Sequence, residues 1–225
     1  MTVKINPTLI RQETRVTPLH RKKLQLAENA SIPGWIKRPW LRVLYETSDF
    51  VHDDDGISRA DVASSEVFRL MEDVWLYRDA LQASKTYACI EHAISSTGSF
   101  THKRYSISSR AAIPDCIRAC YLDILLSMER EGYVAGKQSD FATAGVGGAI
   151  IDQDGSLLRC LGASHRMAAA IVVGVTGGFP LRIVGAHQAW LHGQGVEAPR
   201  DLARLGPAIR AVESRHAKPN YCQQL

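Results

Sequence analysis

Two apolar runs separated by an Asp-Gly pair constrain the fold of this chain more than any other feature. The stretch reads VGGAIIDQDGSLLRCLG, with Asp154-Gly155 near its centre. An Asp-Gly pair between apolar runs is typical of a tight hairpin turn, because glycine adopts positive φ without strain. The pattern therefore predicts a β-hairpin over residues 146–161.

The segment that follows the hairpin predicts a short helix and then a strand. Ser164 can cap a helix, the apolar stretch HRMAAAIVV can continue it, and Gly174 can end it. The next segment, FPLRIVGAH, has the composition of a strand, which we expect near residues 180–185.

Helical periodicity dominates the middle of the chain. Residues 114–131 carry an apolar stripe, with Pro114 in the first turn and Gly132 at the carboxyl end, and predict one helix. Residues 61–93 predict one long helix or two, capped by Asp61 or Ser64. The remaining expectations are irregular structure with short helices over 1–60, a polar loop or hairpin over 95–110, and a short helix within 200–214.

Length and composition bound the class of protein. The chain has 225 residues and is 45% hydrophobic, enough for a real core. Its longest apolar runs fall short of the ~20 residues that span a bilayer, and its first residues lack the apolar region of a signal peptide. We therefore expect a cytoplasmic protein without a transmembrane segment.

The five cysteines are odd in number and lack CxxC spacing, which favours reduced and mostly buried thiols. Cys116 and Cys120 share one face of the predicted helix and could ligate a metal. Because neither a second close pair nor a histidine partner accompanies them in the sequence, the structural interpretation is favoured.

Charge is distributed unevenly along the chain. Residues 1–45 hold nine Lys or Arg against Glu13 and Glu28, although the net charge is only +4. This basic arm is interpreted first as a solvated or internally paired surface, and second as a contact for nucleic acid or an anionic membrane. Zinc-finger, RNA-binding and heptad signatures are missing from the sequence, so nucleic acid is possible but not favoured.

His165 and Arg166 open the Ala-rich helix, which is an unusual place for cationic side chains. A helix amino terminus carries partial positive charge and N–H groups without intrahelical partners. The arrangement makes sense if an anion binds in front of these residues.

The order helix, loop, hairpin, Gly-x-Ser-His-Arg, short helix, strand resembles the ParB/sulfiredoxin superfamily. SMEREGYV resembles the helix that precedes the motif in that family, and PLRIVGAHQAW the strand that follows it, with His187 and Trp190 as a His-x-x-Trp ending. The resemblance covers about a third of the chain. It implies an α+β (mixed) fold, with a ParB/sulfiredoxin-like core and a helical amino-terminal extension.

The implied domain organisation has three parts: a mainly helical extension over 1–110, a nucleotide-binding core over 111–195, and a tail with a short helix over 196–225.

In this superfamily the His-Arg helix start commonly binds nucleotide phosphates. Members include ATP-using sulfiredoxin, free-serine kinases and CTP-hydrolysing partition proteins. The resemblance implies ATP or another nucleoside triphosphate, with Mg²⁺, a small hydroxylated metabolite as substrate, and a possible homodimer. The residues expected to hold the nucleotide are Gly162, Ala163, Ser164, His165, Arg166, Lys137, Ser139 and His187.

Two departures from the family pattern limit the chemistry. Ser164 stands where sulfiredoxin has its cysteine, and a serine without a base is a poor nucleophile. Gly162 stands at the acidic position of the kinases and can act neither as base nor as ligand. A phosphotransferase would need another carboxylate. We expect Asp152 or Asp140, with His165, in the catalytic set, Asp152 as the metal ligand, and Asp154 in the turn.

The sequence thus predicts a nucleotide-binding enzyme, an ATP-dependent phosphotransferase or nucleotide hydrolase. The alternatives are a non-catalytic ParB-like nucleotide- or DNA-binding protein, and a degenerate scaffold or biosynthetic partner. Arg166 and His165 could also pair with Asp152 or Asp154 in a structural role.

Overall fold

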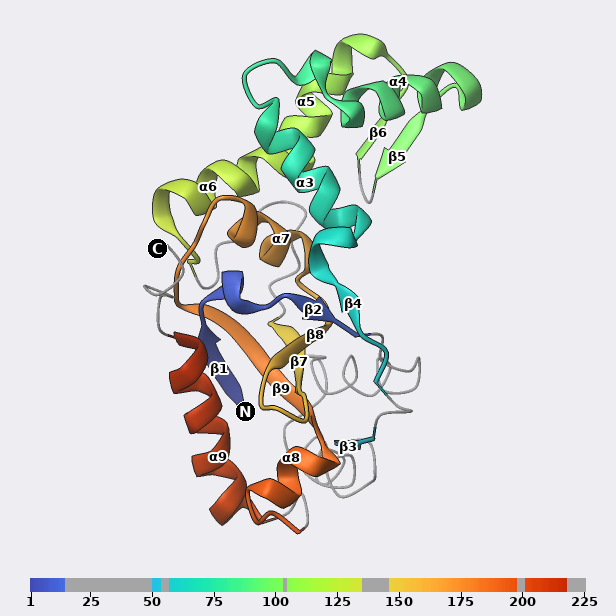
Figure 1. Cartoon of the computed structure of the whole chain (residues 1–225). Helices are drawn as coiled ribbons and strands as arrows, with labels where there is room; N and C mark the ends of the chain where they lie inside the picture. The colour runs from blue at the N-terminus through green and yellow to red at the C-terminus, as the bar shows by residue number, and fades with distance from the viewer. Residues whose placement is uncertain (15–49, 54–56, 103–104, 135–145, 198–200, 218–225) are drawn as a thin grey trace, which may run out of the picture. The chain divides into compact units, whose positions relative to one another are not determined.

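A computed structural model describes residues 1–14, 50–53, 57–102, 105–134, 146–197 and 201–217 (Figure 1). The chain forms two compact units. The sheet unit comprises Met1–Val62, Gly145–Gly162 and Gly177–Leu225, and the helical unit comprises Ala63–Ala144 and Ala163–Thr176. The fold is mixed α+β, as expected.

The sheet unit is built on a seven-stranded mixed sheet, counted over the described residues. The hydrogen-bonded order is β1-β9-β7-β8-β2-β4, and β3 pairs with β9. β7 and β3 run parallel to β9, while β1 runs antiparallel to it. The strands are β1 (Thr2–Ile5), β2 (Gln12–Glu13), β3 (Val51–His52), β4 (Ala60–Asp61), β7 (Gly147–Ile151), β8 (Leu157–Leu161) and β9 (Phe179–His187).

The predicted hairpin and the predicted strand are confirmed. β7 and β8 pair antiparallel around Asp154-Gly155, and Gly155 has φ +82°. A Cβ at Gly155 would lie 2.9 Å from Arg215 Nη1 and 3.3 Å from Trp190 Nε1. Glycine suits this position chiefly because of its positive φ, and any larger residue would also crowd the buried Trp190 ring, whereas the exposed Arg215 side chain could move aside.

Among the described residues, the α-helices of the sheet unit are α8 (Gln188–Gly193) and α9 (Leu202–Ala217). α9 is longer than the short helix expected there, and it packs along β1 (Figure 1). The contact includes hydrogen bonds from Lys4 N to Glu213 Oε1 at 2.7 Å and from Asn6 N to the His216 carbonyl at 2.7 Å.

The helical unit contains α3 (Glu66–Leu76), α4 (Lys85–Thr97), α5 (Ile113–Ile117), α6 (Asp123–Glu131), α7 (Ser164–Val172) and the hairpin of β5 (Phe100–His102) and β6 (Tyr105–Ile107). α7 packs against α3 and α6. The segment predicted as one helix or two is two helices, capped by Ser65 and Ser84. The expected caps, Asp61 and Ser64, were wrong, the latter by one residue.

The helix predicted over 114–131 is continuous but not uniform. α5 leads into a π-helical turn at Arg118–Leu122, which leads into α6, and Gly132 ends the run as predicted. The N–H of Asp123 donates to the Arg118 carbonyl, five residues back. Such turns are uncommon and often lie at functional sites.

The two units do not follow the predicted boundaries at 110 and 195. β1 and β2 come from the expected helical extension and α9 from the expected tail, yet all three are part of the sheet unit. Most of the basic arm lies outside the described residues. Among the residues described, no helix is long and apolar enough to cross a membrane.

Candidate functional site

Polar side chains gather in the sheet unit where three parallel strands end. In β7 and β9, Ile151 is paired with Ala186, so Asp152 and His187 follow at the carboxyl ends of neighbouring strands. His52 on β3 is the register partner of His187. Carboxyl ends of parallel strands are a common place for functional groups.

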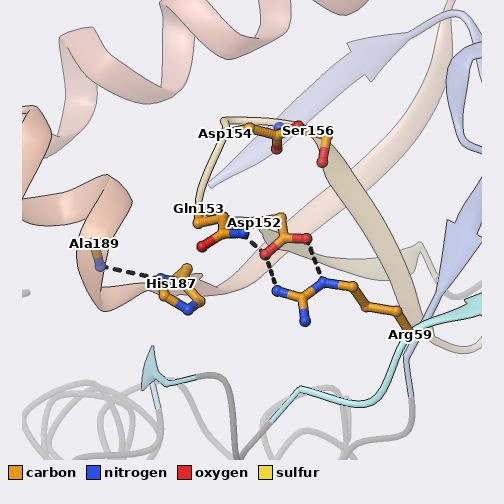
Figure 2. Close-up of polar contacts among 7 residues, drawn as sticks. All are labelled: Arg59, Asp152, Gln153, Asp154, Ser156, His187 and Ala189. Atoms are coloured by element: carbon orange, nitrogen blue, oxygen red, sulfur yellow. Dashed lines mark hydrogen bonds and ion pairs between the residues drawn. The ribbon is translucent and has the colours of Figure 1, made fainter.

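Asp152 is held by Arg59 in a bidentate ion pair (Figure 2). Arg59 Nε donates to Asp152 Oδ2 at 2.8 Å and Nη2 donates to Oδ1 at 2.7 Å, while Gln153 N donates to Oδ1 at 2.8 Å. The hydrogen bonds from Arg59 lower the pKa of Asp152, against the opposing effect of burial. Both carboxylate oxygens are thus occupied by a guanidinium, which argues against the predicted role as a metal ligand.

His187 caps α8. Its Nδ1 accepts the N–H of Ala189 at 3.1 Å (Figure 2). An imidazole that accepts at Nδ1 carries its proton on Nε2. Trp190, three residues on, is buried, and its Nε1 lies beside the position that a Cβ of Gly155 would take. The His-x-x-Trp ending therefore has a structural use in this fold, as a helix cap and a support for the hairpin turn.

His52 lies across β9 at Gly185. A Cβ at Gly185 would meet His52 Nε2 at 2.5 Å and the Phe50 carbonyl at 3.2 Å. The glycine in VGAH is therefore required by the approach of β3, and the sequence carries no local signal for this contact.

Asp154 belongs to the hairpin turn, as predicted. Its Oδ1 accepts the N–H of Ser156 at 2.8 Å, and hydrogen bonds from Ser156 lower its pKa. The carboxylate is exposed and supports the turn.

Gly162 lies at the other end of this hairpin from Asp152. β8 runs antiparallel to β7, with Gly148 opposite Leu161 and Ile151 opposite Leu157, so Asp152 lies near the turn and Gly162 at the open end. Asp152 and Gly162 are thus about five residues apart along the strand direction, which corresponds to roughly 16 Å. Asp152 is therefore not positioned to serve a phosphate bound at Gly162.

The amino end of α7 belongs to the helical unit. Its N-cap is Ala163, and Ser164 is the first helical residue, so the prediction that Ser164 caps the helix was wrong. Ala163 has φ +50°, the one non-glycine residue with positive φ among the residues described. Its methyl side chain cannot accept the hydrogen bond that a capping serine would.

His165 lies in a cluster of three rings. The Tyr121 and His165 rings are stacked, with centroids 6.0 Å apart and planes at 12°. His102, from β5, lies 5.4 Å from Tyr121 and 6.0 Å from His165, centroid to centroid. Tyr121 is in the π-helical turn and is buried, and burial raises its pKa. Arg166, the next residue in α7, is only 7% exposed.

The sequence-predicted residues thus fall into three groups. Asp152, Gly162 and His187 belong to the sheet unit, and Ala163 with Ser164, His165 and Arg166 to the helical unit. Lys137, Ser139 and Asp140 lie outside the described residues. Sequence reasoning missed Arg59, His102 and Tyr121 as partners. Their contacts join residues far apart in the chain, and only the apolar stripe that contains Tyr121 gave any signal.

The positions of potential metal ligands give no support for a metal site held by protein side chains alone. Within the described parts of the chain, no group of three or more His, Cys, Asp or Glu could hold a metal ion. Three of the described cysteines (Cys116, Cys120 and Cys160) are buried, Cys89 is exposed, and none of these four is in a disulfide. The expectation of reduced and mostly buried thiols agrees with these four residues.

Comparisons with protein-family models, curated proteins and solved structures find no match to this chain.

Proposed function

We propose that this protein binds a nucleotide through its phosphate groups at the amino end of α7, with ATP as the first ligand to test. The observation that carries the proposal is the composition of the first turn. Ser164, His165 and Arg166 form it, with two potentially cationic side chains and no acidic residue. Helix amino termini favour anions, so cationic groups there are best accommodated when an anion lies between them and the N–H groups.

The backbone before the helix supports the same ligand. Ala163 adopts the left-handed region and Ser164 the helical region. Consecutive residues of opposite hand turn their N–H groups toward one point and form a concave anion-binding nest. The left-handed conformation costs an L-residue roughly 1–2 kcal/mol, and such strain is concentrated at functional sites.

Two side chains complete the proposed site. Arg166 brings a planar guanidinium that can donate two parallel hydrogen bonds to phosphate oxygens. His165 can donate one hydrogen bond, and its ring is held by stacking on Tyr121.

Mg²⁺ would enter with the phosphates of the nucleotide rather than as an ion held by protein ligands. Two observations support this form of the proposal. The described residues contain no group of three or more His, Cys, Asp or Glu that could hold a metal ion, and Asp152 is ion-paired with Arg59. Bound Mg²⁺ would neutralise charge on the phosphate oxygens.

Phosphoryl transfer to a small hydroxylated metabolite, or nucleotide hydrolysis, is the reaction class that we propose to follow binding. Either reaction needs a carboxylate that orients the nucleophile. Asp140 is the residue to test in that role, because Asp152 is occupied by Arg59.

A thermal-shift screen tests the proposed binding. The ligands are ATP, CTP, GTP, AMP, inorganic phosphate and a short DNA duplex, each with and without Mg²⁺. A ligand that binds only the native state at one hundred times its Kd stabilises it by about 2.7 kcal/mol. We expect a nucleoside triphosphate to raise the Tm of the wild-type protein and of Arg69→Ala, an exposed arginine on α3 that serves as a control for the loss of one arginine away from the first turn of α7.

The same ligand should raise the Tm of Arg166→Ala much less. A screen in which DNA alone raises the Tm would favour the nucleic-acid alternative. A screen in which no ligand shifts the wild-type Tm would contradict the proposal.

A further inference from the structure

Cys116 and Cys120 lie against each other inside the helical unit. Their Sγ atoms are 3.9 Å apart, and the residues are 1% and 5% exposed. A disulfide has an S–S length of about 2.05 Å, so bonding would bring the two sulfurs closer by roughly 1.9 Å. The pair is therefore in contact but not bonded.

The helix that carries the pair is already irregular at this point. Cys116 lies near the carboxyl end of α5, and Cys120 lies in the π-helical turn at Arg118–Leu122. Side chains four residues apart in a helix have Cβ atoms about 5–6 Å apart, whereas a disulfide prefers about 3.5–4.5 Å. Bond formation must therefore deform the turn, and a π-helical turn is a local departure from regular α-helix where such a change can occur.

We infer that Cys116 and Cys120 are a modification site, an oxidisable thiol pair that forms a reversible disulfide and thereby displaces Tyr121. Hydrogen peroxide, the co-reactant, oxidises one thiol to a sulfenic acid and releases one water. The second thiol then attacks the sulfenic sulfur, forms the S–S bond and releases a second water. Two thiols lose two hydrogen atoms in total, and one peroxide is reduced to two waters.

The expected properties of this disulfide follow from its surroundings. Burial raises the pKa of the Cys116 thiol, so its thiolate population is small and oxidation is slow. A bridge that deforms its helix is strained, and strained disulfides are reduced more easily than structural ones. The pair should therefore oxidise slowly and be reduced readily.

Tyr121 connects this pair to the proposed nucleotide site. It follows Cys120 directly in the π-helical turn, and its ring is stacked on His165. A shift of the turn would remove the face against which His165 is held. This consequence rests on the proposed function, whereas the disulfide itself does not.

The sequence provides a direct assay for the bridge. Trypsin cleaves after Arg110, Arg118 and Arg130, which places the two cysteines on the separate peptides 111–118 and 119–130. After peroxide treatment and alkylation of remaining thiols, we expect these peptides to be joined in a non-reducing digest, two hydrogen atoms lighter than their sum. Dithiothreitol should separate them.

Variants give the matched controls. Cys89→Ser removes the exposed cysteine of α4 and should leave the joined peptide unchanged, whereas Cys120→Ser should abolish it. The wild-type digest decides the question even if Cys120→Ser does not fold. Oxidation at Cys89 without any joined peptide 111–118/119–130 would overturn the inference.

Nucleotide binding is measured separately on the reduced and the peroxide-treated Cys89→Ser protein. We expect Mg²⁺-ATP to bind the oxidised form about tenfold more weakly, since a lost hydrogen bond to a charged group corresponds to at least a decade in Kd. Equal affinity of the two forms would refute the coupling to α7. Absence of binding in the reduced form would refute the proposed function, while the digest would still decide the disulfide.

Discussion

Removing Arg59 should destabilise the sheet unit through the carboxylate that it leaves behind. Asp152 accepts two charge-assisted hydrogen bonds from Arg59, at 2.7 and 2.8 Å, and its side chain is only 7% exposed. Losing one partner of a buried ion pair costs about 3–5 kcal/mol. The Arg59 side chain is 29% exposed, so we expect the lower end, about 3 kcal/mol, for Arg59→Met at pH 7.

The pH dependence of this loss has a definite sign. In the wild-type protein the pKa of Asp152 is lowered, so the stability from this group is complete above its unfolded pKa and is lost as pH falls through the folded pKa. In Arg59→Met the largest cause of the lowered pKa is removed, while burial, which raises the pKa, remains opposed by the Gln153 N–H and by His187, so we expect the pKa of Asp152 to be higher than in the wild type. The buried carboxylate then destabilises the variant at neutral pH, and protonation relieves the cost as pH falls from 7 toward 4. The difference in the free energy of unfolding between the wild type and Arg59→Met should therefore become smaller as pH falls.

Urea unfolding at pH 7, 5.5 and 4 measures the effect. Asp152→Asn is the control, because its amide has the same shape and does not titrate. The double variant Arg59→Met/Asp152→Asn should be more stable than Arg59→Met at pH 7, since it contains no buried unpaired carboxylate. A stability difference that is constant with pH, together with a double variant less stable than Arg59→Met, would refute this reasoning.

Two further predictions concern the backbone. Gly155→Ala should cost more than Gly98→Ala in the free energy of unfolding. Both glycines have φ near +80°, with a backbone cost of about 1–2 kcal/mol for alanine. Only at 155 would the new Cβ also crowd a buried side chain, with Trp190 Nε1 at 3.3 Å, whereas at 98 nothing lies within 4 Å. Comparative urea melts check this, and equal losses would mean that the turn packing contributes nothing. Ser65→Ala should cost about 1 kcal/mol, because its Oγ accepts the Phe68 N–H at 3.3 Å, and Ser164→Ala should cost less, because Ser164 is not an N-cap. A larger loss at Ser164 in the same assay would contradict the assignment of the cap.

Local signals in the sequence predicted the local structure well. The Asp154-Gly155 turn, the helix after it and the strand of β9 each depend on neighbouring residues, so periodicity and turn chemistry were sufficient. The π-helical turn was not predicted, because an apolar stripe is compatible with both kinds of helix. The cap at Ala163 was missed because serine is the usual cap and a left-handed alanine is rare.

Long-range pairing could not be predicted from one sequence. β1 joins β9 across most of the chain, and Arg59 reaches Asp152 over 93 residues, with no local pattern to indicate either contact. The candidate site was therefore predicted less well than the local structure. Asp152 and Gly162 are close in sequence, but the antiparallel hairpin places them at opposite ends of its strands.

The central claim is that phosphates bind at the amino end of α7, and isothermal titration of Mg²⁺-ATP into Arg166→Ala tests it most directly. A lost charge-assisted hydrogen bond is worth about 1.5–3 kcal/mol, so affinity should fall roughly tenfold to a hundredfold relative to wild type. Arg166→Lys should recover part of the loss, because it restores charge without the planar fork, and Arg69→Ala should bind like wild type. Unchanged affinity in an Arg166→Ala protein whose circular dichroism matches wild type would contradict the account.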